Sequence, residues 1–125
     1  MNFGAQEARS KMLKLICQVV GENMVFSITI QETDLVHDLK CKIKEENPRL
    51  VLCDARELQL YLAKKDGKWI KDDDPILEDL SKEDIPEEVR KQFINNEVKM
   101  KATRLLGKYF FGELIPKKRE VHVFV

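Results

Sequence analysis

The sequence predicts an α+β domain in which a mixed β-sheet packs against one main helix and one or two shorter helices. Two runs rich in β-branched residues, 15–20 and 25–30, flank a short loop that is typical of a hairpin. Apolar residues then recur every four positions from Leu35 to Ile43, as in an amphipathic helix. Leucines next alternate with other residues over 58–62, as in a strand with one buried face. A hairpin, a helix and a strand in this order are the opening of a β-grasp fold.

Length and composition bound the class of protein. With 125 residues, 43% of them hydrophobic and 35% charged, the chain can bury a core as one domain without metal or disulfide support. We expect this domain to span 12–125, after a segment 1–11 that lacks periodicity and is typical of a disordered arm or a leader remnant. The formal net charge of zero argues against a general nucleic-acid binder. The longest apolar run near the start, 15–20, is too short to span a bilayer.

The cysteines indicate reduced thiols. There are three of them, an odd number, and their spacing does not describe a disulfide framework. Cys17 falls on the apolar side of the first predicted strand, where it would act as a small buried hydrophobe. We therefore expect a protein that works in a reducing compartment, even if it is secreted on the way there.

In the predicted hairpin, the second strand has one wet face. Its residues Phe26, Ile28 and Ile30 point one way, while Ser27 and Thr29 point the other. The helix that follows is expected to begin at an N-cap formed by Thr33 or Asp34 and to end at Asn47-Pro48.

The leucine strand is expected to bury Leu58, Leu60 and Leu62 on one face. The same alternation places Gln59, Tyr61 and Ala63 on the other face, which faces solvent. Asp66-Gly67 then predicts a tight turn, followed by a further short strand over 68–70.

The second half of the chain is expected to hold short helices and one last strand. Ser81 is expected to cap a helix that reaches Phe93 and Ile94, and a short helix is expected around 102–106. The run 116–119 predicts a surface loop. The last strand, 120–125, is expected to be central in the sheet and parallel to the first. It would bury three side chains on one face: Val121, Val123 and Val125.

A search for catalytic and metal-binding patterns predicts no enzyme and no cofactor. The sequence has no Gly-rich phosphate loop, nucleophile elbow or helical zinc-protease motif, and it has two histidines. His37 and Cys41 have the spacing of two ligands on one helix face, and Cys53 could add a third. Since two ligands are too few for a metal, this pattern favours a surface histidine beside a half-buried thiol.

An aromatic and basic cluster raises the question of nucleic-acid binding. Tyr61 and Trp69 lie near several lysines, which is typical of surfaces that stack bases. The acidic residues in the same segment, Asp66 and 72–74, would repel a phosphate chain. The sequence therefore disfavours nucleic acid as a partner of this region.

The leucine strand also carries a resemblance to a known family. Residues 58–64 read Leu-Gln-Leu-Tyr-Leu-Ala-Lys, which resembles the L-x-L-F-L-A-K motif of the Crinkler effectors of oomycetes and some fungi. Tyr61 is the one departure, since it adds a hydroxyl to the phenylalanine of the motif. Other segments resemble parts of the Crinkler N-terminal region in the same order: the opening strand at 14–17, the first helix at 34–40, the Ile-Pro-Glu-Glu segment at 85–89 and the closing His-Val-Leu-Val run at 120–125.

The resemblance implies a fold and a function. The Crinkler N-terminal region is described as ubiquitin-like and is held to direct a secreted effector into the host cell, with the host nucleus as a common destination. A variable C-terminal domain, which we do not expect within these residues, then acts on the host. The resemblance thus implies a non-catalytic targeting and translocation domain that works through contacts with host or self proteins.

The resemblance also assigns site residues. The translocation motif would be Leu58, Gln59, Leu60, Tyr61, Leu62, Ala63 and Lys64, and the closing motif His122, Val123, Phe124 and Val125. The run Pro116-Lys117-Lys118-Arg119 resembles a short nuclear-localisation signal, and it is also typical of an ordinary Lys-rich loop.

One alternative of another class remains open at this stage. The same fold prediction fits an intracellular ubiquitin-like adaptor that binds partner proteins through its sheet face and takes no part in secretion. A small metal-dependent enzyme built on His37 and Cys41 is the third hypothesis.

Overall fold

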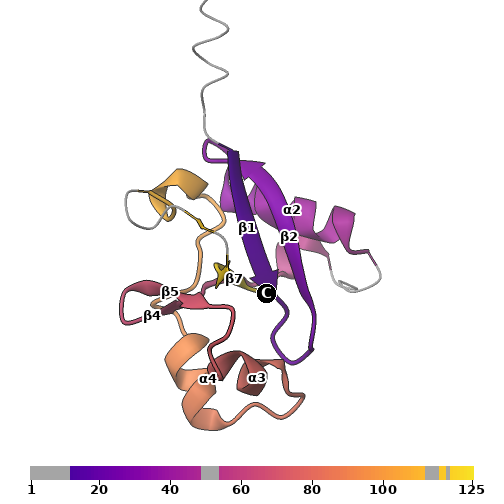
Figure 1. The fold of residues 1–125 in the computed structure, drawn as a ribbon. Coiled ribbons are helices and arrows are strands. Elements are labelled where there is room, and N and C mark those ends of the chain that lie inside the picture. The colour runs from indigo at the N-terminus through magenta and orange to yellow at the C-terminus, as the bar shows by residue number, and fades with distance from the viewer. Residues whose placement is uncertain (1–11, 49–53, 112–115, 118) are drawn as a thin grey trace, which may run out of the picture.

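The computed structural model describes residues 12–48, 54–111, 116–117 and 119–125. These residues form two small sheets with helices beside them (Figure 1). In chain order the elements are β1 (Met12–Gln18), β2 (Val25–Gln31), α2 (Val36–Glu46), the 3₁₀ turn η1 (Ala55–Glu57), β3 (Tyr61–Leu62), β4 (Lys64–Lys65), β5 (Lys68–Lys71), α3 (Ile76–Ser81), α4 (Glu87–Phe93), the 3₁₀ turn η2 (Leu106–Lys108), β6 (Glu120–Val121) and β7 (Val123–Phe124).

The larger sheet has the strand order β2-β1-β7-β3. β1 and β2 form the predicted antiparallel hairpin, β7 runs parallel to β1, and β3 runs antiparallel to β7. The last strand of the chain is therefore central in the sheet, as the sequence predicts. α2 lies behind the β1–β2 hairpin (Figure 1). The α+β class is confirmed, and the strand order agrees with the β-grasp prediction.

The smaller sheet joins three short strands in the order β4-β5-β6. β4 and β5 are connected by the predicted turn, in which Asp66 and Gly67 have φ of 56° and 78°. Glycine adopts such angles without strain, which explains its place in a two-residue hairpin turn. β6 continues directly toward β7 in the other sheet, so the segment 120–124 links the two sheets.

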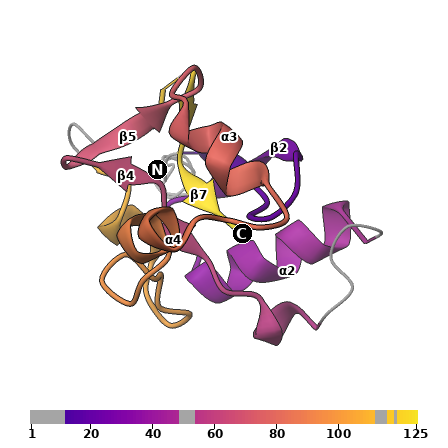
Figure 2. The same ribbon diagram turned by 90° about the horizontal axis from the view of Figure 1, so that it is seen from below.

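Two hydrophobic cores lie on either side of this shared segment. The first core lies between the larger sheet and α2, and it holds Leu13, Leu15, Cys17, Ile28, Ile30, Val36, Leu39, Ile43, Leu58, Leu60, Leu62, Trp69, Met100, Leu106, Phe110 and Val123. The second core is formed with α3 and α4 and holds Ala63, Ile70, Leu80, Ile85, Phe93, Val121 and Phe124. Seen from below, β7 lies between α2 and α3 (Figure 2). The two neighbours Val123 and Phe124 therefore belong to different cores.

This arrangement corrects the prediction that Val121, Val123 and Val125 share one buried face. Val123 belongs to the first core and Val125 packs against it, but Val121 belongs to the second core. The strict alternation of a strand breaks at His122, where the chain passes from β6 in one sheet to β7 in the other.

The leucine motif is buried as predicted, although its strand is shorter. Leu58, Leu60 and Leu62 are all buried, and the regular strand covers only the two residues of β3. The Leu60 carbonyl accepts a hydrogen bond from the Met100 N–H at 2.8 Å. The prediction that Ala63 faces solvent is wrong, because the second core covers that face and buries Ala63 completely.

The helix boundaries differ from the predicted ones. Leu35 rather than Thr33 or Asp34 is the N-cap of α2, and the Asp38 carboxylate accepts the Leu35 N–H at 2.8 Å. The end of α2 at Asn47 agrees with the prediction.

Ser81 does not cap α4 as expected. It is the last residue of α3, and its hydroxyl donates to the Glu78 carbonyl at 2.8 Å. α4 begins instead directly after Pro86, whose fixed φ suits a helix start. α3 itself was not predicted; the Asp74 carboxylate accepts the Ile76 N–H at its first turn.

The expected helix at 102–106 is replaced by a turn and by η2. The Arg104 N–H donates to the Lys101 carbonyl at 3.0 Å, which closes a single turn. The Gly107 N–H then donates to the Glu32 carbonyl at 2.8 Å, and a Cβ at Gly107 would lie 3.2 Å from that oxygen. Tertiary contacts of this kind, rather than helix propensity, set the path of the segment. Within the described part of the chain, no helix is both long and apolar enough to cross a membrane.

Candidate functional site

The two segments that resemble family motifs lie side by side. β3 pairs antiparallel with β7, which sets Tyr61 opposite Phe124 and Leu62 opposite Val123. The Ala63 N–H then donates to the His122 carbonyl at 3.0 Å. The leucine motif and the closing motif therefore form one joint, which we call the motif joint and define as residues 58–64 with 120–125.

Most side chains of the leucine motif point into protein rather than into solvent. The three leucines and Ala63 are buried, so they contribute to folding through the hydrophobic effect. Of the motif, Gln59 is exposed, and Tyr61 and Lys64 are partly so. The Tyr61 hydroxyl donates to the Gln59 side-chain oxygen at 2.7 Å, and it forms an outward-facing polar pair.

His122 is the centre of the motif joint and is completely buried. Its Nδ1 accepts the Ile16 N–H at 3.0 Å, and its own N–H donates to the Ile16 carbonyl at 2.9 Å. Burial lowers the pKa of His122, while the nearby Glu120 carboxylate partly opposes the shift. Because Nδ1 accepts a hydrogen bond, the proton of the neutral ring lies on Nε2.

The other ring nitrogen of His122 faces a carboxylate. Nε2 lies 3.5 Å from Glu120 Oε1, a distance too long for a good hydrogen bond. The second oxygen of Glu120 lies 3.5 Å from the Lys71 ammonium at the protein surface. The motif joint thus places the neutral imidazole of His122 beside the Glu120 carboxylate, which also faces the surface ammonium of Lys71.

Trp69 is part of the core rather than a surface for bases. Trp69 is 5% exposed, and its ring stacks on Phe110 with centroids 5.1 Å apart, while the ring of His122 meets it edge-on at 5.6 Å. The Lys64 ammonium lies 5.2 Å from the Trp69 centroid, within the range of a cation–π contact. Burial also lowers the pKa of Lys64. Trp69 and Lys64 of the aromatic and basic cluster therefore form a packed structural pair, while Lys65 and Lys68 are exposed.

His37 and Cys41 both lie on the surface of α2, and Cys41 is exposed rather than half-buried as the sequence pattern favours. His37 Nε2 and Cys41 Sγ are 3.6 Å apart, so the expected one-face arrangement is present. Cys53, the possible third ligand, lies outside the described residues. Over the ranges that the structure describes, no three histidine, cysteine or carboxylate side chains gather in a way that could hold a metal ion.

Three residues of the basic run 116–119, namely Pro116, Lys117 and Arg119, are described and lie outside helices and strands, and two of them have acidic partners. The Lys117 N–H donates to the Glu120 carboxylate at 3.2 Å, and the Arg119 guanidinium lies 3.7 Å from Asp72. Lys118 lies outside the described residues. The side chains of Lys117 and Arg119 are exposed, which leaves their charges accessible to a partner.

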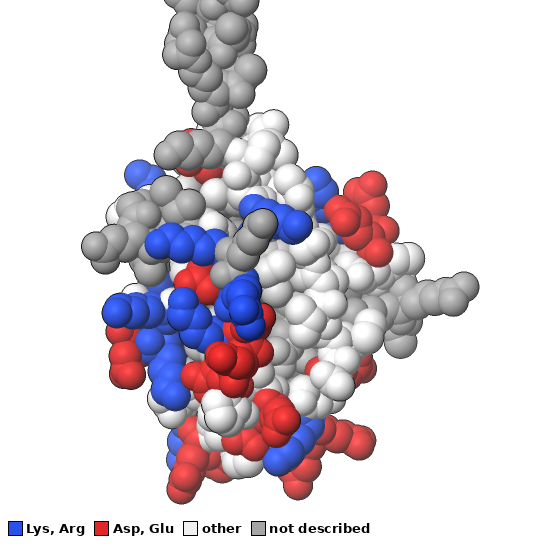
Figure 3. Space-filling model, in the orientation of Figure 1, with Lys and Arg blue, Asp and Glu red and all other residues white. Residues whose placement is uncertain are grey.

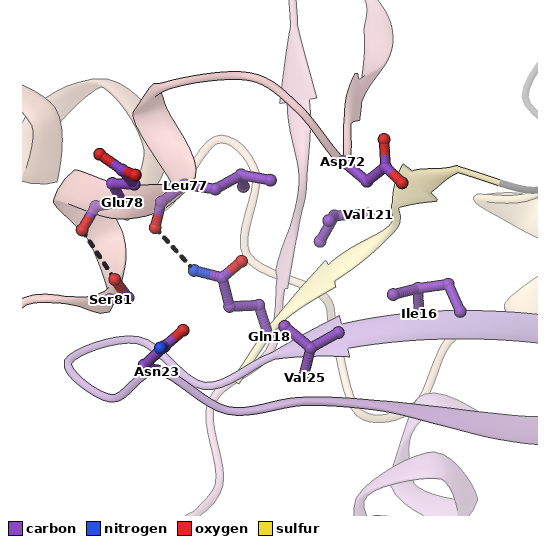
Figure 4. A pocket seen from close by; sticks show the side chains of 9 residues that line it. All are labelled: Ile16, Gln18, Asn23, Val25, Asp72, Leu77, Glu78, Ser81 and Val121. Carbon is purple, nitrogen blue, oxygen red and sulfur yellow. Dashed lines mark hydrogen bonds between the residues drawn. The ribbon is translucent and has the colours of Figure 1, made fainter.

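A shallow groove separates the hairpin from α3 (Figure 4). Its volume is about 250 Å³, and its walls are mainly apolar, with Ile16 and Val25 on one side and Leu77 on the other. The Gln18 side chain crosses the groove floor and donates to the Leu77 carbonyl at 2.9 Å. This contact ties α3 to the larger sheet.

The face of the β1–β2 hairpin beside this groove is poor in charge. Figure 3 shows a broad area over β1 and β2 in which uncharged side chains predominate, with lysine, arginine and acidic side chains gathered around it. One charged residue, the exposed Lys14 of β1, lies on this face opposite Thr29 of β2. Two of its apolar side chains are largely in solvent: Met12 is 56% exposed and Val25 is 57% exposed. Ser27 and Thr29 lie on the same exposed face. We call this area the hairpin face; its composition is typical of a protein-contact surface.

These features define a small α+β domain in which most side chains of the leucine motif are buried and the exposed hairpin face is poor in charge. Comparison with known proteins then identifies the family. Residues 13–125 match the model of the Crinkler effector protein N-terminal domain, so the chain belongs to that family. The resemblance inferred from the sequence is confirmed.

Relatives in the curated collections carry the same name. The chain is 37% identical over 123 residues to Crinkler effector protein 63 of Phytophthora sojae, which covers 91% of this chain and 27% of the relative. It is 48% identical over 60 residues to Crinkler effector protein BLC01 of Bremia lactucae, covering 47% of this chain and 30% of the relative. The chain thus spans less than a third of either relative. No solved structure matches, so the ubiquitin-like description rests on the strand order.

Proposed function

We propose that this domain is the non-catalytic targeting part of a secreted Crinkler-type effector and that it enters host cells through protein contacts. The observation that carries the proposal is the burial of the family motif. Because Leu58, Leu60, Leu62 and Ala63 lie in the two cores, the motif acts by maintaining the fold rather than by touching a partner. A partner must then read a surface that the motif supports.

The hairpin face is the surface best suited to that role. It is poor in charge, with Lys14 as its charged member, and it exposes Met12 at one end and Val25 at the other, where Val25 lines the apolar groove with Leu77. Contacts of this composition favour a protein partner over nucleic acid, whose binding depends on clustered Lys and Arg. The partner is a host or self protein. The relatives extend well beyond the matched region, which fits a separate effector domain that follows the targeting one.

A reporter fusion tests the proposal and separates folding from recognition. Residues 1–125 fused to a fluorescent protein should enter host cells, and Val25→Asp should reduce entry without changing the melting temperature. Leu60→Met, which conserves side-chain volume, should leave both nearly unchanged. Ser27→Ala on the same face serves as a mild control. If Leu60→Met melts like the parent but fails to enter, the leucines are themselves a recognition surface and the proposal is wrong.

Delivery to the host nucleus is the finer part of the proposal. The exposed cations Lys117 and Arg119 support it, because an importing receptor binds accessible basic side chains. Replacing 117–119 with alanines should shift the reporter from the nucleus to the cytoplasm while entry itself continues. If the fraction of the reporter in the nucleus does not change, the basic run is not a nuclear-localisation signal.

A second candidate function uses the same hairpin face. An intracellular adaptor with this fold would bind partners there without any secretion step. The entry assay distinguishes the two, since an adaptor fusion supplied from outside would stay outside. Sequencing of the gene provides an independent test, because a targeting domain should be encoded upstream of a further domain and an adaptor need not be.

A further inference from the structure

An unusual lysine lies on the buried stripe of α2. Lys40 is 7% exposed, and its helix neighbours Val36, Leu39 and Ile43 belong to the first core. Lysines this deeply covered are normally paired with an anion. Among the residues that the structure describes, no carboxylate forms an ion pair with Lys40 and no oxygen accepts a hydrogen bond from it.

Lys40 lines a pocket of about 490 Å³ whose other charged walls are also cationic. Lys99 and Lys101 contribute the remaining charges, Asn96 and Thr103 contribute polar groups, and no Asp or Glu is among its lining residues. Burial lowers the pKa of Lys40, and the charge of Lys99 lowers it further. Two ammonium groups that repel one another at a concave surface create a site of positive potential.

The pocket is held in shape by backbone hydrogen bonds between the loop and α2. The His37 N–H donates to the Ala102 carbonyl at 3.0 Å, and the Val36 N–H donates to the Arg104 carbonyl at 2.9 Å. The Tyr109 hydroxyl accepts the Lys101 N–H at 3.0 Å. These contacts use the free N–H groups of the first turn of α2 to fix the loop. The backbone that carries Lys99 and Lys101 is therefore fixed beside α2 before any ligand arrives, which reduces the cost of binding.

We propose that this pocket binds a phosphate-class oxyanion, free or at the end of a small soluble molecule, through the ammonium groups of Lys40, Lys99 and Lys101. A dianionic group would supply the counter-charge that Lys40 lacks among the described residues. Charge-assisted hydrogen bonds from ammonium to phosphate are strong and short. The site lies on α2 and the 99–103 loop, and it is independent of the proposed function.

Pyrophosphate and inorganic phosphate are the probes that test the proposal on the full 125-residue chain. At low ionic strength, with sodium chloride as an ionic-strength control, pyrophosphate should raise the urea midpoint in a saturable way. Amide resonances of 99–103 should shift with the same apparent Kd. Lys40→Met and Lys99→Gln should each weaken binding by about tenfold or more. Lys68→Gln, a change of an exposed lysine on β5, should bind like the parent.

The Lys40→Met variant also separates binding from packing. Methionine conserves much of the aliphatic stem, so a lysine that merely packs its stem would give a variant with unchanged pyrophosphate binding. In the absence of ligand, Lys40→Met should be at least as stable as the parent, because it removes the repulsion by Lys99. Absence of a saturable response to pyrophosphate, or equal binding by Lys40→Met, would overturn the proposal. Binding to phosphoinositide vesicles without binding to pyrophosphate would overturn it too.

Discussion

Ile16 and His122, 106 positions apart in the chain, exchange two hydrogen bonds inside the protein: the Ile16 N–H donates to Nδ1 of the imidazole, and the His122 N–H donates to the Ile16 carbonyl. The ring nitrogen thus takes the place of a strand carbonyl where the chain passes from β6 to β7. A side chain that completes a ladder in this way lets one segment serve two sheets. In this chain His122, the first residue of the run that resembles the closing motif, therefore holds the two sheets together.

His122→Ala is expected to destabilise the domain. The change leaves the buried Ile16 N–H without its acceptor, which costs about 1–3 kcal/mol, and it opens a void against Trp69. Urea unfolding followed by Trp fluorescence measures the loss. The matched control is His37→Ala on the surface of α2, which should stay within about 0.5 kcal/mol of the parent. Equal stability of the two variants would show that the Ile16 contact contributes nothing.

Stability should also fall on mild acidification. The pKa of His122 is lowered on folding from its ordinary 6.5, so the unfolded chain gains a proton just below that pH while the folded chain does not. The free energy of unfolding therefore decreases as pH drops from 6.5 toward the folded pKa, by at most about 1.4 kcal/mol per pH unit. Urea midpoints on both sides of this window measure it. His122→Asn should lose less stability over the same interval, and an identical loss would assign the effect to the carboxylates.

Leu60→Ala should cost about 2–5 kcal/mol, because Leu60 is fully buried in the first core and the change leaves a cavity. Two neighbouring lysines provide the contrast. Lys64→Ala loses the contact over Trp69 and should cost up to about 1 kcal/mol. Lys65→Ala loses only a surface pair with Asp74 and should cost less than that. Chemical denaturation gives all three values, and a Leu60→Ala variant as stable as Lys65→Ala would refute the core assignment.

A chain that ends at Arg119 should be unfolded or aggregated. The truncation removes the central strand and five buried side chains: Glu120, Val121, His122, Val123 and Phe124. Each buried apolar one contributes about 1.5–3 kcal/mol, against a total stability of about 5–15 kcal/mol for a domain of this size. Circular dichroism of the truncated chain measures its secondary structure, and size-exclusion chromatography shows whether it aggregates. Removal of Val125 alone, which loses two backbone hydrogen bonds at the strand end, should leave a folded monomer. A folded monomer ending at Arg119 would make the whole segment a peripheral tail.

The thiols should differ in reactivity. Cys17 is fully buried and its pKa is raised by burial, so it stays protonated and inaccessible in the folded state, whereas Cys41 is exposed. Iodoacetamide followed by peptide mass mapping should modify Cys41 first and Cys17 only in urea. Cys41→Ser should leave the protection of Cys17 unchanged. Labelling of native Cys17 as fast as Cys41 would mean that β1 opens readily.

The sequence by itself determined the features that depend on local periodicity. The hairpin, the apolar stripe of α2, the Asp66-Gly67 turn and the burial of Leu60 all follow from spacings of two or four residues and from turn chemistry. The β-grasp order of these elements predicted the central place of the last strand, and the resemblance added the family. These predictions need no knowledge of what packs on the opposite side of each element.

Only the tertiary structure decided which segments have a hydrophobic core on both of their faces. Ala63 and Val121 are buried because α3, α4 and the second sheet form another core behind the motif joint, and no local pattern shows which distant elements will cover a face. The same holds for His122, whose role depends on Ile16 at the other end of the chain. Lys40 stands at a position of α2 that the helical period marks as apolar, and that conflict was the one local sign of its burial. Its cationic surroundings arise from a loop some sixty residues later in the chain, because burial and electrostatic potential depend on non-local contacts.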